Sequence, residues 1–99
     1  MAEDGDFLTE IVAERTARNP GFPGLVEAAA RRRELLRELT TRRQKLGLSQ
    51  TAVAAVMGAS QSAAARLEAG EVDAKLSTVE RFAAAIGHRI EWRIVKTRR

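Results

Sequence analysis

Hydrophobic residues recur every three or four positions along most of this chain, which is the spacing of amphipathic helices. The stretch 50–57, for example, places Val53, Ala54 and Met57 on one face, and the other stretches show the same arrangement. Only the tail, residues 89–95, alternates polar and apolar residues as a strand does. The pattern predicts a mainly α protein with helices over residues 6–18, 25–46, 50–57, 61–69 and 76–86.

The two central helices are marked by capping residues at both ends. Ser49 and Ser60 stand where a hydroxyl can accept hydrogen bonds from the N–H groups that open a helix. Gly58 and Gly70 stand where a helix closes, because glycine readily adopts the left-handed backbone conformation. Two helices separated by a turn of about three to four residues containing glycine form the helix-turn-helix motif. Residues 48–70 are therefore predicted to hold this motif.

The second helix of the motif has an inward and an outward face. Ala64 and Leu67 face inward, and Ala54 and Ala59 are small enough for the two helices to meet closely. In such motifs the first helix braces the second, which enters the major groove of DNA. Glutamine and arginine are the side chains that pair with adenine and guanine edges. The candidate base-contacting residues are those of the outward face: Gln61, Ser62, Ala65 and Arg66.

The flanking helices supply the rest of the predicted core. In helix 25–46 the residues that can line one side are Val26, Ala29, Leu36, Leu39 and Leu46, with Leu35 flanking. In helix 76–86 the core stripe consists of Val79, Phe82, Ala83 and Ile86, with Leu76 just ahead of it. These positions are expected to pack against the central motif.

Basic residues of the long helix have two interpretations. Arg31 and Arg42 follow Glu27 and Glu38 by four residues, which is the spacing of helical ion pairs. The run 31–33 is therefore interpreted as a solvated face, with DNA contact as the alternative. Nearer the motif, phosphate contact and a solvated face stay equally open. The candidates for phosphate contact there are Arg42, Arg43 and Lys45.

The alternating tail predicts a single β-strand. A lone strand leaves its backbone groups unpaired, and the same strand of a second copy could pair with it across a two-fold axis. Ile90, Trp92 and Ile94 would then face the helices, and the protein would be a homodimer. The alternative is a frayed tail whose tryptophan packs locally.

Charge divides the chain unevenly. Its 99 residues carry a net charge of +4, yet residues 1–27 hold six acidic and two basic residues. An acidic arm, residues 1–24, is thus predicted to precede a basic domain, residues 25–99, across the break at Asn19 to Gly24. Such a domain suits a polyanion as partner.

Catalytic and metal-binding patterns are lacking. The chain has no cysteine and one histidine, His88, so we expect neither an enzyme nor a metal or other cofactor. No apolar run has the length of a membrane span, and the acidic start is unlike a signal peptide. We therefore expect a cytoplasmic protein.

The acidic arm carries an apolar stripe formed by Phe7, Leu8, Ile11 and Val12. An acidic amphipathic helix can lie in a groove of a basic protein, which gains both apolar burial and electrostatic attraction. The stripe could equally pack on Leu35 and Leu39 of its own chain.

The motif of residues 48–70 resembles that of the Xre/Cro, lambda-repressor-like helix-turn-helix proteins, through SQ-x-x-VA-x-x-MG-x-SQS-x-x-x-RLE-x-G. The resemblance implies a five-helix domain, here with an extra N-terminal helix and the C-terminal strand. It also implies binding to double-stranded DNA at an inverted-repeat operator, with bases read by the second helix and phosphate contacted by Ser49 and Gln50. Ala63, Ala64 and Ala65 depart from the bulkier or polar residues usual in relatives, and Glu68 matches a glutamate interpreted as structural.

Over residues 6–95 the layout is similar to that of HigA-type antitoxins. That resemblance implies neutralisation of a small basic ribonuclease toxin of the RelE/HigB kind and repression of the protein's own operon. The alternative is a stand-alone Xre-family or phage-type repressor with no toxin partner.

Overall fold

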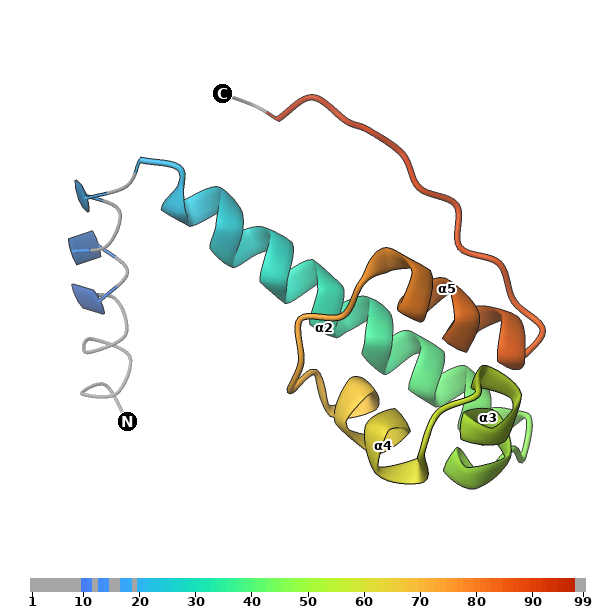
Figure 1. Ribbon diagram of the computed structural model, residues 1–99. Coiled ribbons are helices and arrows are strands. Elements are labelled where there is room, and N and C mark those ends of the chain that lie inside the picture. The colour runs from blue at the N-terminus through green and yellow to red at the C-terminus, as the bar shows by residue number, and fades with distance from the viewer. Residues whose placement is uncertain (1–9, 12, 15–16, 19, 98–99) are drawn as a thin grey trace. The chain divides into compact units, whose positions relative to one another are not determined.

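The computed structural model describes residues 10–11, 13–14, 17–18 and 20–97. The chain forms two structural units, Met1–Glu34 and Leu35–Arg99. Four helices are labelled in the described part of the chain (Figure 1): α2 (Phe22–Lys45), α3 (Gln50–Met57), α4 (Gln61–Ala69) and α5 (Leu76–Ala85). The mainly α prediction is thus confirmed, whereas the five-helix domain is corrected to these four helices.

The first unit contains the start of α2 and short helical pieces before it. Residues 10–11, 13–14 and 17–18 are helical, and the predicted helix start lies outside the described residues. Helix α2 begins at Phe22, three residues earlier than predicted, with Pro23 inside its first turn. Proline fits there because the first N–H groups of a helix have no intrahelical partner. The predicted boundary at residues 24 and 25 therefore falls inside a continuous helix.

Two ion pairs predicted from spacing along α2 are present. Glu27 pairs with Arg31 at 3.5 Å between carboxylate and guanidinium, and Glu38 pairs with Arg42 at 2.9 Å. Both pairs are exposed, so each contributes only a few tenths of a kcal/mol to helix stability.

The core of the second unit is made by α3, α4 and α5 around the C-terminal part of α2 (Figure 1). Phe82 and Ala83 of α5 are fully buried, and the whole predicted stripe of that helix is inside. Three residues of the predicted core are instead exposed: Val26 by 38%, Leu46 by 55% and Leu76 by 59%. Leu46 lies outside because α2 ends at Lys45. The buried hydrophobic cluster consists of Leu36, Leu39, Val53, Met57, Leu67, Val79, Phe82, Ala83 and Ile86.

The tail forms no strand within residues 88–97, which corrects the predicted C-terminal strand. Ile90 packs against the core, and Trp92 Nε1 donates a hydrogen bond to Glu80 Oε2 at 2.9 Å. Ile94 is fully exposed in the single chain. A β-ladder needs a second strand, and the described residues of one chain provide none.

Candidate nucleic-acid interface

Helices α3 and α4 have the boundaries that the capping residues predict. Ser49 Oγ accepts a hydrogen bond from the N–H of Ala52 at 3.0 Å, and Ser60 Oγ accepts one from the N–H of Ala63 at 3.1 Å. Gly58 ends α3 with φ +72°, a left-handed conformation that side-chain-bearing residues rarely adopt. The two helices are thereby joined by a short, defined turn.

Small side chains bring the two helices together. Ala54 of α3 and Ala64 of α4 are both almost fully buried, and Ala59 in the turn packs against the core cluster. The N–H of Ala59 donates to the carbonyl of Ala54 at 2.9 Å, which closes the turn onto α3. Larger residues at these positions would push α4 away from its brace.

The outward face of α4 presents a short row of polar groups. Gln61, Ser62 and Arg66 are exposed, and Ala65 is half-buried between them and the core. The Arg66 guanidinium has no hydrogen bond or ion pair within the described part of the chain, so its donors face solvent. Hydroxyl, amide and guanidinium groups on one exposed helix face can hydrogen-bond base edges.

Behind this face, a hydrogen-bonded network joins α2, α3 and α4. Arg43 donates from Nε to Glu68 Oε2 at 2.5 Å and from Nη2 to Glu68 Oε1 at 3.0 Å. Gln50 Nε2 donates to the same Oε1 at 2.9 Å, and Gln61 Nε2 donates to Gln50 Oε1 at 2.7 Å. The Arg43 guanidinium also donates to the carbonyl of Leu48 at 2.8 Å.

This network changes the candidate list for phosphate contact. Arg43 is buried with its donors turned to Glu68 and Leu48, so we remove it from the candidates. Sequence spacing could not reveal this role, since the partner lies 25 residues away. Lys45 and Ser49 are exposed, and Arg42, although paired with Glu38, is exposed too.

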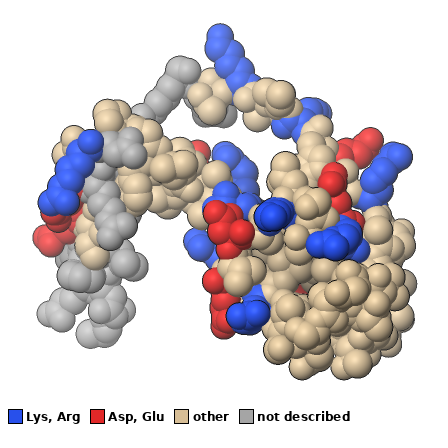
Figure 2. All heavy atoms as spheres, in the orientation of Figure 1, with Lys and Arg blue, Asp and Glu red and all other residues tan. Residues whose placement is uncertain are grey.

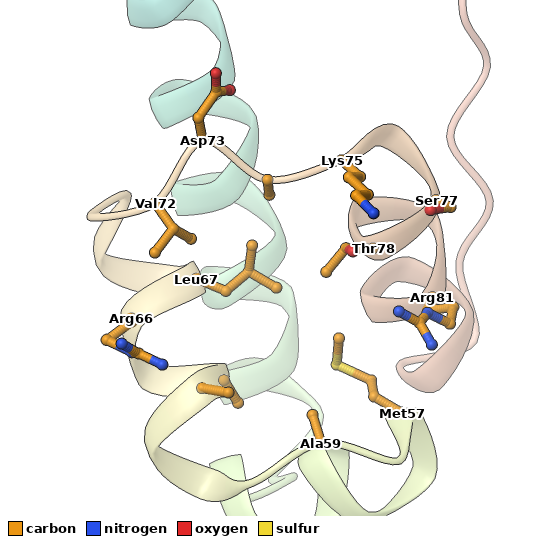
Figure 3. A pocket seen from close by; sticks show the side chains of 13 residues that line it. Met57, Ala59, Arg66, Leu67, Val72, Asp73, Lys75, Ser77, Thr78 and Arg81 are labelled. Atoms are coloured by element: carbon orange, nitrogen blue, oxygen red, sulfur yellow. The ribbon is translucent and has the colours of Figure 1, made fainter.

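A hollow of about 430 Å³ lies between α4 and the start of α5, and Met57 and Ala59 also line it. Figure 3 shows Arg66 on one side of it and Arg81 on the other, with Leu67 and Thr78 between them. Lys75 also lines it, and Asp73 is its acidic lining residue among the described ones. Lys75 and Arg81 are therefore basic residues near the outward face that sequence reasoning missed.

Charge is sparse over the motif itself. Figure 2 shows a largely uncharged area where α3 lies, as expected because α3 contains no charged residue. The basic residues that line the hollow are Arg66, Lys75 and Arg81. An uncharged helix flanked by cations can approach a polyanion without local repulsion.

Two other kinds of site are not found in the described residues. No cluster of three or more acidic or histidine side chains there could hold a metal ion. None of the described helices is long and apolar enough to cross a membrane. His88 Nδ1 lies 2.8 Å from the carbonyl of Ile86, where it supports the end of α5.

The chain belongs to the helix-turn-helix domain family, whose pattern matches residues 34–88. It is similar to Antitoxin HigA1 of Mycobacterium tuberculosis, in the strains CDC 1551 / Oshkosh and ATCC 25618 / H37Rv, with 38% identity over 86 residues. The matched region covers 87% of this chain and 58% of the relatives, so the chain spans little more than half their length. No solved structure shows significant similarity to it.

Proposed function

We propose that this protein is a sequence-specific DNA-binding transcriptional regulator that reads the major groove with α4. One observation carries the proposal: α4 presents Gln61, Ser62 and Arg66 to solvent from a rigid brace formed by α3. The family match over residues 34–88 supports the same function. Ala65, which is half-buried on the same face, would lie against the bases between the polar side chains.

Phosphate contacts would orient the domain without reading sequence. We assign them to two groups of polar side chains: Arg42, Lys45, Ser49 and Gln50 next to the start of α3, and Lys75 and Arg81 around the hollow. Gln50 is half-buried and the other five residues are exposed. The Ser49 hydroxyl accepts from Ala52, which leaves its own proton to donate to a phosphate oxygen.

The protein would bind its operator as a homodimer. The tail supports this proposal, because Ile94 and Val95 are exposed. In addition, residues 88–97 form no β-ladder within the described chain. An antiparallel pairing of two tails would satisfy those groups and cover the exposed apolar side chains. Two-fold symmetry of the protein then implies an inverted-repeat operator.

The finer proposal is an antitoxin role. Similarity to Antitoxin HigA1 over 87% of the chain supports it. The partner would be a small basic ribonuclease toxin of the RelE/HigB kind, and the protein would repress the operon that encodes both, acting in the cytoplasm. The acidic arm is our candidate for the toxin-binding element; of its apolar stripe Ile11 is half-buried, whereas Phe7, Leu8 and Val12 lie outside the described residues.

Two experiments test these proposals separately. Footprinting of the full chain on its own promoter should protect an inverted repeat, and protection of no defined site would contradict the regulator. Expression of the neighbouring reading frame alone should poison cells, and co-expression of this chain should rescue them.

The arm is tested by residues 20–99 in the same rescue assay. If the arm binds the toxin, the shortened chain binds the operator but does not rescue growth. Full rescue by residues 20–99 would exclude the arm as the binding element. A neighbouring frame that is harmless when expressed alone would favour the stand-alone repressor instead.

A further inference from the structure

The hydrogen-bonded network described above connects a buried ion pair to Gln61, a residue of the proposed base-reading face. It runs from Arg43 through Glu68 and Gln50 to Gln61, over distances of 2.5 to 3.0 Å. We propose that Glu68, which does not reach the DNA-facing surface, is a positioning residue that fixes which atoms of the Gln61 amide face the DNA bases. The inference rests on the proposed DNA-binding function and extends it to specificity.

The first step is the identity of the group at the inner end. A carboxylate can only accept hydrogen bonds, whereas a glutamine amide can donate through Nε2 or accept through Oε1. Glu68 Oε1 therefore requires Nε2 of Gln50 on its side, at the observed 2.9 Å. The amide of Gln50 is thereby held in one of its two possible orientations.

The second step carries this orientation outward. With Nε2 turned to Glu68, Gln50 presents Oε1 toward α4, and an oxygen there requires a donor. Gln61 meets it with Nε2 at 2.7 Å. Gln61 is thus left with its Oε1 acceptor and its second N–H for an outside partner. Adenine offers the complementary pair, an N6 donor and an N7 acceptor, in the major groove.

The third step is the rigidity of the inner end. The side chains of Arg43 and Glu68 are 10% and 7% exposed, and two hydrogen bonds join them. Arg43 is held in turn by the carbonyl of Leu48, just before α3 begins. Because the carboxylate is clamped by a two-pronged donor, it cannot rotate away from Gln50 without breaking a buried ion pair.

The test measures base preference rather than affinity alone. The base pair read by Gln61 is defined as the one where Gln61→Ala loses discrimination among operator variants. Gln50→Met keeps the length of the side chain and leaves the ion pair of Arg43 and Glu68 intact. It should lower the preference at that base pair about tenfold, to the level of Gln61→Ala. The preference at the base pair read by Arg66 should stay unchanged.

Glu68→Gln should show the same selective loss, since an amide at the inner end no longer dictates the orientation of Gln50. Circular dichroism checks that this variant is folded; if it does not fold, Gln50→Met carries the test. Gln44→Met makes the same chemical change at an exposed glutamine of α2 and should leave every preference unchanged. Wild-type preference at the Gln61 base pair in folded Gln50→Met would overturn the proposal.

A measurement without DNA separates this proposal from the proposed function. In the free protein, the side-chain amide resonances of Gln61 should shift toward those of a solvated glutamine in Gln50→Met. Unchanged resonances would overturn the proposal, whatever the DNA results. If the resonances shift but Gln61→Ala alters no base preference, the reading face of the proposed function is wrong and Glu68 has no role in specificity.

Discussion

Arg43 of α2 and Glu68 of α4 form a buried ion pair with two hydrogen bonds, of 2.5 Å and 3.0 Å, although 25 residues separate them in the chain. The pair joins α4 to the C-terminal part of α2. Because the guanidinium also bonds the carbonyl of Leu48, the start of α3 is held at the same point. The orientation of α4 is therefore fixed by a polar contact as well as by apolar packing.

We expect Arg43→Ala to lower the free energy of unfolding by about 3–5 kcal/mol, because it leaves the Glu68 carboxylate buried without its partner. Urea titration of the full chain measures this. The matched control is Arg42→Ala, which removes an exposed ion pair with Glu38 and should cost less than about 1 kcal/mol. Equal effects of the two substitutions would show that the pair of Arg43 and Glu68 is not buried in solution.

The second prediction concerns the stability of the turn between α3 and α4. Gly58→Ala should destabilise the protein by about 1 kcal/mol or more through backbone strain alone, since a Cβ there meets no atom within 4 Å. Gly24→Ala is the control: the added Cβ is equally unobstructed, and the residue lies in α2 without a left-handed φ. It should be neutral or stabilising by up to about 1 kcal/mol. Thermal unfolding of both variants compares them directly.

The third prediction concerns the DNA affinity contributed by the basic residues around the hollow. Lys75→Ala and Arg81→Ala should each weaken binding to all DNA sequences by a similar factor, because phosphate contacts carry no sequence information. Each should also reduce the slope of log affinity against log salt by about one. Binding measured between low and moderate salt gives both quantities. An unchanged slope would place these side chains away from the phosphates.

The fourth prediction concerns the role of the tail in dimerisation. Deletion of residues 89–99 should yield a monomer in sedimentation, with operator affinity falling further than the lost charge explains. The operator of the full chain should have half-sites with centres about 34–36 Å apart, or a multiple of this distance. A truncated chain that still sediments as a dimer would exclude tail pairing.

The helix boundaries of the motif could be predicted from the sequence, because they depend on residues at the helix ends themselves. The caps Ser49 and Ser60 and the stop Gly58 fixed both helices of the motif to the residue. The apolar spacing of α5 likewise identified its buried stripe. Residue spacing could not predict contacts between residues that are distant in sequence. In the sequence Arg43 is one of several basic residues of a helix, and only the fold shows that it pairs with Glu68.

The other differences between the sequence-based predictions and the structure also have physical reasons. Leu46 continues the apolar spacing of α2, but the helix ends one residue earlier and the side chain is left outside. The alternating tail favours a strand, yet a strand is defined by its partner, and one chain supplies none in the described residues. Lys75 and Arg81 became candidates only when the fold placed them around one hollow with Arg66.

The most direct test of α4 as the reading helix is a base-by-base scan of operator affinity for the full chain, Gln61→Ala and Arg66→Ala. Each variant should lose about 1–3 kcal/mol of discrimination at its own base position and keep the wild-type preference elsewhere. If both variants keep the wild-type preference at every position, α4 does not read the operator and the central claim is wrong.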